Sequence, residues 1–211
     1  MSRERTHKGR REDILRAALG LFGDKGIHDT RIEEVAVAAG IGKGTIYEYF
    51  RSKEELIAAA ILYEMEALTD MVRHSMEQQD TVRDKLKAIV ETVALHRRQH
   101  HLTGMLDINP ASIGSSMKDL KDLFLEQNAI WRSWLEEMVA NGVSSGEIRH
   151  IDAQLFLGAL KGAILELIHP WNSQICEEIS PAETAELVID FFFNGIGHHA
   201  CNDSLKTARL R

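Results

Sequence analysis

The sequence predicts an all-α protein with a small three-helix unit at its N-terminal end and a larger helical bundle behind it, about nine helices in all. Three observations lead to this prediction. The 211 residues include only three prolines and are rich in helix-forming Ala, Leu, Glu, Lys and Arg. Apolar residues recur at helical spacing, and no alternating runs joined by a tight turn indicate a β-hairpin. The composition, 44% hydrophobic and 27% charged, is typical of a folded globular chain.

Charge is distributed unevenly along the chain. Residues 1–53 carry eleven Lys or Arg against eight acids, a balance of +3, whereas the remainder carries fourteen against twenty-four, a balance of −10. Residues 1–11 hold five bases and one acid and resemble a basic arm that follows phosphates. The N-terminal end therefore suits a polyanionic partner, and the acidic remainder does not.

Composition also predicts the location of the protein. Two cysteines, Cys176 and Cys201, are too few for a disulfide framework, which favours a reducing, cytoplasmic compartment. No apolar run reaches the roughly 18 residues that a membrane span needs. The charged N-terminus has no apolar segment behind it, so we expect neither a signal peptide nor a membrane partner.

The N-terminal unit is predicted from apolar stripes and helix caps. A helix over about 10–25 ends at Gly26. The sequence Thr30-Arg31-Ile32-Glu33 matches a capping box, with Thr30 as the cap, and opens a helix over 31–38. Gly40 allows a tight turn, and a helix over 42–50 follows. Two short helices joined by such a turn predict a helix-turn-helix.

The remaining helices are predicted in the same way. Ser52-Lys53-Glu54-Glu55 is a second capping box, and Asn141-Gly142 and Ser180-Pro181 indicate a helix end and a helix start. The expected ranges are 52–76, 81–96, 97–107, 117–139, 152–168 and 181–197. We divide the chain into a DNA-binding unit, residues 1–51, and an effector-binding and dimerisation unit, residues 52–211.

A family resemblance covers about residues 10–60. It rests on Ile14-Leu15-x-Ala17-Ala18-x-x-Leu21-Phe22, Gly26, Thr30, Ile32-x-x-Val35-Ala36, Ala39-Gly40-Ile41, Lys43-Gly44-Thr45-Ile46-Tyr47-x-Tyr49-Phe50 and Ser52-Lys53-Glu54-Glu55-Leu56. These residues resemble the DNA-binding domain of the TetR family of transcriptional regulators. The rest of the chain resembles the family in length and helical character alone.

The helix over 42–50 is the candidate reading helix, because a major groove about 12 Å wide admits one helix. Lys43 has the reach for a guanine edge or a phosphate, and tyrosine hydroxyls suit phosphates. The resemblance implies DNA contacts at Thr30, Arg31, Lys43, Gly44, Thr45, Tyr47, Tyr49 and Lys53. Glu48 departs from the family pattern: it either accepts from a cytosine amino group, which would restrict the operator, or points away from DNA, which we expect.

The C-terminal helices are candidates for dimerisation. Gly158-x-x-x-Gly162 forms a small-residue face, and the last helix carries Leu187, Val188, Phe191, Phe192, Phe193 and Ile196, more apolar surface than one buried stripe uses. The residues alone fit a monomer core equally well. The resemblance implies a homodimer held by a four-helix bundle of the last two long helices.

The middle helices are candidates for an effector pocket. Large, deformable apolar side chains suit a small hydrophobic effector, and we select Met105, Leu106, Phe124, Trp131, Trp134 and Met138. A Met and Trp stripe at helical spacing is more often ordinary core. The resemblance implies a pocket in this region and does not identify its occupant.

Histidine spacing raises the question of a metal. His96 and His100 share a helix face, but no carboxylate or cysteine ligand can be placed beside them from sequence, so we expect a solvated face and no metal. No Ser-His-Asp or Cys-His ordering indicates catalysis, and we expect no cofactor and no enzyme activity.

The sequence thus predicts a ligand-responsive transcriptional repressor. It binds a pseudo-palindromic operator as a homodimer and is released by a small apolar effector. Two alternatives stay open: a helical small-molecule or metal-binding protein with a vestigial helix-turn-helix, and a metal-dependent enzyme using His96 and His100.

Overall fold

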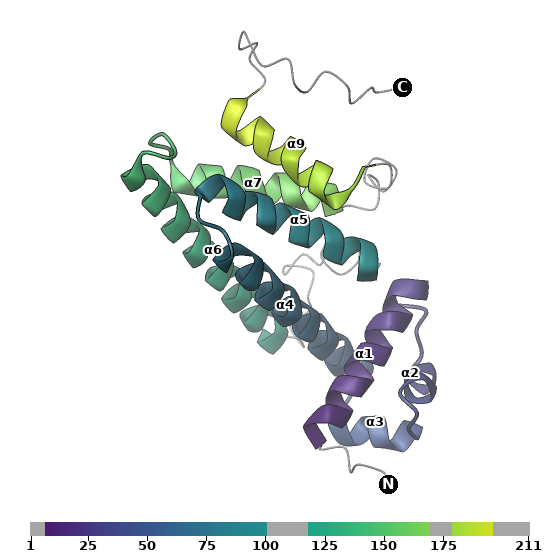
Figure 1. Ribbon diagram of the computed structural model, residues 1–211. Helices are drawn as coiled ribbons and strands as arrows, with labels where there is room; N and C mark the ends of the chain where they lie inside the picture. Colours follow the sequence, from purple (N-terminus) through teal and green to yellow (C-terminus); the bar gives the residue numbers. More distant parts are fainter. Residues whose placement is uncertain (1–6, 101–117, 169–178, 196–211) are drawn as a thin grey trace.

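The computed structural model describes residues 7–100, 118–168 and 179–195, and these ranges contain eight α-helices and no strand (Figure 1). The helices are α1 (His7–Lys25), α2 (Ile32–Ala38), α3 (Lys43–Tyr49), α4 (Lys53–Glu77), α5 (Val82–His100), α6 (Lys118–Ser145), α7 (Ala153–Ile168) and α9 (Pro181–Asn194). The all-α prediction is confirmed. None of these helices is long and apolar enough to cross a membrane.

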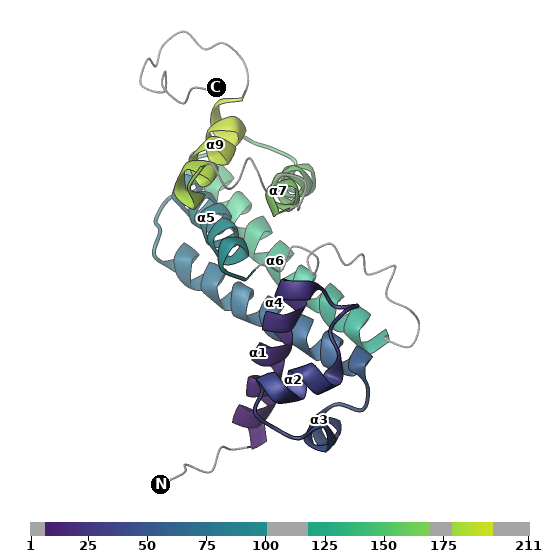
Figure 2. The same ribbon diagram turned by 90° about the vertical axis from the view of Figure 1, so that its right-hand side faces the viewer.

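Two hydrophobic cores hold the helices together, and α4 contributes to both. The first core packs α1, α2 and α3 on the start of α4 and ends at Ile61. The second begins at Leu68 on the same helix and continues into α5, α6, α7 and α9. Figures 1 and 2 show α1, α2 and α3 gathered at one end of α4, with α6 running beside its remainder. The division between residues 51 and 52 stays a prediction.

Most predicted caps are confirmed. The Ser52 hydroxyl accepts from the backbone N–H of Glu55 at 3.2 Å, which is half of the predicted box, while the Glu55 carboxylate accepts from the backbone N–H of Arg51 at 2.7 Å. At the predicted helix start at 152, the Asp152 carboxylate accepts from the backbone N–H of Leu155 at 2.8 Å. The Ser180 backbone N–H donates to the Glu183 carboxylate at 2.8 Å, so α9 begins with a capping box where the sequence predicted a cap followed by proline. These caps are local, since each side chain reaches a backbone group three or four residues away.

The cap at α2 was predicted one residue too early. Arg31 is the N-cap, and its backbone N–H donates to the Glu34 carboxylate at 2.8 Å. The Thr30 hydroxyl instead donates to the carbonyl oxygen of Gly26 at 2.7 Å, across the loop that leaves α1. Thr30 is buried there, so its side chain fastens the loop rather than capping the helix.

Three predicted helix boundaries were wrong. Helix α5 continues through residue 97 to His100, so no separate helix begins at 97, and residues 101–107 lie outside the described residues. Helix α9 ends at Asn194, because Gly195 has φ +68°. Helix α6 passes through Gly142 and ends before Gly146, whose φ is +76°.

Gly142 has a packing role in place of the predicted terminal one. A Cβ atom at this position would lie 2.7 Å from Cγ2 of Val82, the first residue of α5, and 3.1 Å from Cγ1 of Ile148. Real Cβ contacts are not this short, so glycine is what allows the start of α5 to pack on α6. This contact joins α5 to α6 in the second core.

Candidate nucleic-acid interface and effector domain

Helix α3 has one buried face and one exposed face. Ile46 and Phe50 are almost fully buried in the first core, at 0% and 1% exposure. Lys43, Gly44 and Tyr47 are exposed. The apolar face fixes the helix on the unit, and the polar face is presented to solvent, as a reading helix requires.

The turn before α3 is the predicted glycine turn. Gly40 has φ +67°, a conformation that L side chains rarely adopt, and the backbone N–H of Ile41 donates to the Ala36 carbonyl at 2.9 Å. Gly42 is the N-cap of α3. The tight connection between α2 and α3 confirms the helix-turn-helix geometry expected from the sequence.

The other DNA-contact candidates occupy different environments. Arg31 is exposed and Thr45 is half-buried. Tyr49 stacks on His7 with ring centroids 4.4 Å apart, which ties α3 to the start of α1. The Lys53 ammonium donates to the His28 carbonyl at 3.1 Å. Thr30 is buried, so its hydroxyl faces the protein interior. Each DNA contact stays a prediction.

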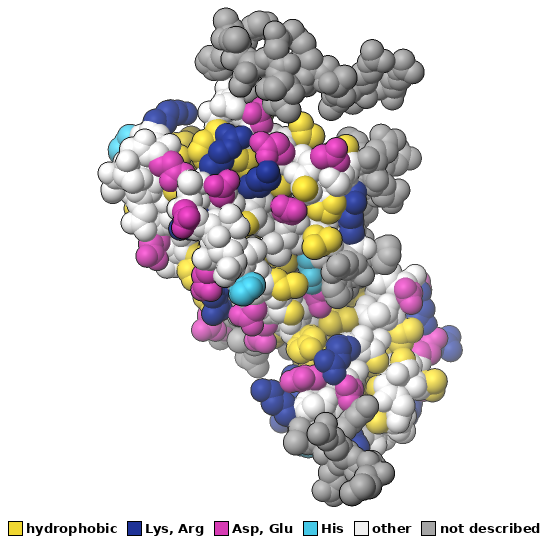
Figure 3. All heavy atoms as spheres, viewed as in Figure 1, with side chains coloured by type: hydrophobic (Ala, Val, Ile, Leu, Met, Phe, Trp, Pro, Cys, Tyr) yellow, Lys and Arg dark blue, Asp and Glu magenta, His cyan; other side chains and the backbone are white. Residues whose placement is uncertain are grey.

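Ion pairs join α2 to both neighbouring helices. Lys43 Nζ lies 2.5 Å from Glu33 Oε1, and Lys25 Nζ lies 2.5 Å from Glu34 Oε2. The hydrogen bond from Lys43 lowers the pKa of Glu33, and the same bond raises the pKa of Lys43. In Figure 3, basic and acidic side chains mingle on the visible face of the N-terminal unit rather than forming one basic patch.

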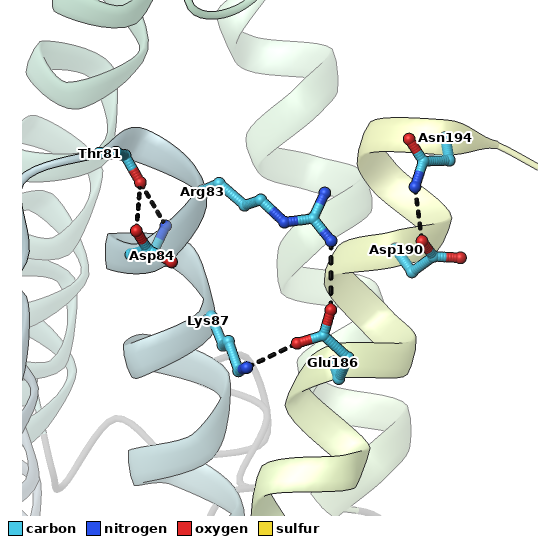
Figure 4. A network of polar contacts seen from close by, with 7 residues as sticks. All are labelled: Thr81, Arg83, Asp84, Lys87, Glu186, Asp190 and Asn194. Atoms are coloured by element: carbon cyan, nitrogen blue, oxygen red, sulfur yellow. Dashed lines mark hydrogen bonds and ion pairs between the residues drawn. The ribbon is translucent and has the colours of Figure 1, made fainter. Parts of the chain in front are cut away.

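A polar network joins α5 to α9 (Figure 4). The Glu186 carboxylate lies 3.2 Å from Arg83 Nη2 and 2.5 Å from Lys87 Nζ. Arg83 also covers the ring of Phe193, with its guanidinium carbon 5.2 Å from the ring centroid. The hydrogen bond from Lys87 lowers the pKa of Glu186. The network fixes α9 against α5 on the side away from the N-terminal unit.

Of the six predicted effector residues, the structure describes the side chains of three. Met105 and Leu106 lie outside the described residues, and Phe124 lies in α6, where its side chain is outside the description. Trp131, Trp134 and Met138 follow on α6. Trp131 Nε1 donates to the Thr69 hydroxyl of α4 at 2.9 Å, and the Arg73 guanidinium of α4 covers the Trp134 ring at 5.0 Å.

These contacts show what the α6 stripe touches. Trp131 and Trp134 both face α4, and Met138 is buried in the second core. The stripe therefore packs partly as ordinary core, and any ligand contact of these residues stays a prediction. Thr69, which sequence reasoning missed, is buried at 5% exposure beside Trp131.

His96 is buried, and the expectation of a solvated face was wrong for it. Its side chain is 6% exposed, and Nε2 lies 2.6 Å from Oε1 of Glu64, which is itself 14% exposed. Glu64 was missed by sequence reasoning. It interrupts the buried row Ala60, Leu68 and Val72 at helical spacing, and this interruption was the available signal. The pair joins α4 to α5 between the two cores.

No group of three His, Cys, Asp or Glu side chains in the described ranges has the arrangement of a metal site. The side chain of His100 lies outside the description.

Helices α7 and α9 leave large apolar side chains exposed. Leu155 on α7 is 73% exposed, and Leu187 and Phe191 on α9 are 54% and 55% exposed. A Cβ added at Gly158 or Gly162 would meet nothing within 4 Å. The small-residue face predicted from the sequence is therefore open in the single chain.

Comparisons with known proteins agree with this geometry. The model of the bacterial regulatory proteins, tetR family, matches residues 14–60, which hold the helix-turn-helix. The chain is 30% identical over 169 residues to the uncharacterized HTH-type transcriptional regulator YhgD of Bacillus subtilis (strain 168). That match covers 78% of this chain and 85% of the relative. The relative's name describes a transcriptional regulator, not an enzyme.

Two solved structures share the fold. The transcriptional regulator FadR from Bacillus subtilis, in complex with stearoyl-CoA, matches with a TM-score of 0.73 at 21% identity, over 88% of this chain and 99% of that one. AibR, in complex with isovaleryl coenzyme A and operator DNA, matches with a TM-score of 0.68 at 19% identity, over 86% and 97%. Both likenesses extend across the N-terminal unit and the larger bundle.

Proposed function

Because the chain belongs to the TetR family of transcriptional regulators, we propose that it is a repressor that binds a pseudo-palindromic operator as a homodimer and is released by a small apolar effector. The observation that carries the proposal is the outer face of α3. Ile46 and Phe50 hold α3 on the first core, while Lys43 and Tyr47 stay exposed and available to a major groove.

The homodimer follows from the reading geometry and the exposed apolar face. One helix-turn-helix contacts one half-site, and specific binding normally needs two reading helices about 34–36 Å apart. The apolar side chains on α7 and α9, Leu155, Leu187 and Phe191, supply a surface for a second copy. The open faces of Gly158 and Gly162 allow another helix to come close.

In place of a wholly apolar effector we propose an acyl thioester of coenzyme A, whose acyl chain is apolar and whose nucleotide part is anionic. The structural neighbours FadR and AibR were solved with stearoyl-CoA and isovaleryl coenzyme A, respectively. An acyl chain is apolar, as the predicted pocket residues require. Chain length is left to experiment, because the two neighbours carry a long and a short acyl group.

Helix α4 is the proposed connection between effector and DNA. It belongs to both cores, and α5 and α6 hold it through the His96–Glu64 pair and the Trp131–Thr69 hydrogen bond. An effector that shifts α5 or α6 therefore shifts α4 and the spacing of the reading helices. Release requires an effector that binds the two arrangements with different affinity.

Selection from a random-sequence duplex pool tests the DNA-binding proposal. The full-length chain should enrich two inverted half-sites whose centres lie about one helical turn, 10–10.5 base pairs, apart. Sedimentation should give a dimer on that duplex, stearoyl-CoA or isovaleryl-CoA should release it, and a reporter under the operator should be repressed. A pool that stays random after repeated rounds would reject the proposal.

A further inference from the structure

One acidic side chain of α2, Glu33, lies beside a lysine that the proposed function assigns to DNA. Glu33 Oε1 lies 2.5 Å from Nζ of Lys43, and the two side chains are 55% and 53% exposed. Lys43 is the first residue of α3. A negative charge therefore lies at the surface next to the first residue of the helix that is to enter the major groove.

A phosphate and the Glu33 carboxylate are alternative partners for the same ammonium group. A charge-assisted hydrogen bond places a phosphate oxygen about 2.8 Å from Nζ. A carboxylate that stayed in its pair would then lie on the order of 5 Å from the phosphate, where two like charges repel each other. Lys43 must therefore exchange one anion for the other when DNA binds.

We propose that Glu33 competes with the DNA backbone for Lys43 and so weakens the hold of the protein on DNA of any sequence. The proposal rests on the function proposed above. The carboxylate stays charged at neutral pH, since the hydrogen bond from Lys43 lowers the pKa of Glu33. Its effect is to reduce the sequence-independent part of binding, leaving discrimination to side chains that read base edges.

A structural role for the same pair predicts the opposite sign. If Glu33 served to hold Lys43 in the orientation that DNA requires, removing the carboxylate would weaken binding. Competition predicts tighter binding on removal. The sign of the change in affinity therefore decides between the two roles, and folding stability does not enter the comparison.

The experiment measures the anisotropy of a labelled random-sequence duplex and of the selected operator, from about 50 to 300 mM salt, with full-length protein. Glu33→Gln should bind both duplexes about two- to fivefold more tightly per half-site, the range expected from exposed ion pairs. In the wild type, Glu33 takes up a cation from solution when Lys43 leaves it for a phosphate, and Glu33→Gln loses this uptake. The slope of log affinity against log salt should therefore steepen by up to about 0.9 per protomer.

Two controls separate this competition from general repulsion. In a Lys43→Gln background, Glu33→Gln should give no gain, because the contested ammonium is gone. Glu34→Gln makes the same charge change one residue along the same helix, and Gln keeps an acceptor for the Arg31 backbone N–H. Glu34 is paired with Lys25 instead, so this variant should gain less than Glu33→Gln.

Each outcome decides the question. Weaker or unchanged binding by Glu33→Gln overturns the proposal, as does an equal gain in the Lys43→Gln background or in Glu34→Gln. A gain on the operator alone also overturns the proposal, because Glu33 would then compete with a base edge for Lys43 rather than with a phosphate. Wild-type protein that binds neither duplex at the lowest salt rejects the proposed function itself.

Discussion

The N-terminal unit and the larger bundle differ in what they withdraw from solvent. In the first unit the core is wholly apolar apart from Thr30, and the ion pairs Lys43–Glu33 and Lys25–Glu34 lie at the surface. The second unit also has surface ion pairs, but it encloses His96 and most of Glu64 between its helices, and it exposes Leu155 and Phe191.

This difference indicates how each unit meets a partner. An exposed pair can exchange one of its members for a phosphate at small cost, because solvent already screens both charges. A polar pair withdrawn from solvent separates at greater cost, since a polar group left in the interior loses its hydrogen-bond partner without gaining water. The first unit is therefore suited to exchanging ionic partners, and the second to transmitting a shift of α5 to α4.

The largest effect should come from breaking the buried pair. His96→Ala removes the imidazole that lies 2.6 Å from Glu64 Oε1 and leaves a cavity, so the loss combines about 1–3 kcal/mol for an unsatisfied buried polar group with the cost of that cavity. Urea denaturation should report this loss, and Lys43→Ala should stay within about 0.5 kcal/mol of wild type, as surface substitutions do. A His96→Ala protein as stable as wild type would remove the distinction between the two units.

A smaller effect is expected at the glycine that joins α5 to α6. Gly142→Ala forces a Cβ to within 2.7 Å of Val82 Cγ2. Overpacking typically costs about 1–3 kcal/mol, which outweighs the helix propensity gained. Gly20→Ala is the matched control in the first unit, because a Cβ there meets nothing within 4 Å.

Thermal unfolding of the two variants checks this expectation. Gly20→Ala should raise stability by up to about 1 kcal/mol, the propensity difference between Gly and Ala. Equal changes in both proteins would show that packing at Gly142 is not tight.

The smallest effect should be the acid sensitivity of the α5–α9 network. Lys87 lowers the pKa of Glu186 in the folded protein below its ordinary value of 4.5. The resulting stability is fully present above about pH 4.5 and is lost as the pH falls through the lowered pKa. Since Glu186 is 41% exposed, we expect less than about 1 kcal/mol.

Chemical denaturation from pH 6 to pH 3 measures this dependence, with Glu186→Gln as the reference. The difference between the two proteins should shrink as the pH falls. A constant difference over that range would mean that the charge on Glu186 does not stabilise the docking of α9.

The elements that sequence reasoning found correctly depend on near neighbours. The caps at Ser52, Asp152 and Ser180 need groups three residues away, and the turn at Gly40 needs the backbone of one residue. Such features are determined by the residues of one short segment. This explains why all eight described helices and the helix-turn-helix were predictable.

The features that sequence reasoning missed depend on distant partners. Gly142 lies inside α6 as a packing glycine because Val82 of α5 occupies the space beside it. Thr30 is an exception in distance, since its hydroxyl donates to the Gly26 carbonyl four residues earlier, in the loop that leaves α1. His96 is buried because Glu64, thirty-two residues earlier, lies opposite it. For Gly142 and His96 the deciding contact comes from another element, which a local pattern does not contain.

The central claim is that the outer face of α3 binds DNA, and the affinity of Lys43→Ala and Tyr47→Phe for the selected operator tests it most directly. Both side chains are exposed, so folding and dimerisation should be unchanged by melting and sedimentation. We predict weaker operator binding for both variants. For Lys43→Ala the salt slope should fall by at most about 0.9 per lost phosphate contact, and by less to the extent that Glu33 takes up a cation when DNA displaces it from Lys43. Wild-type affinity in both variants would contradict the placement of the reading helix.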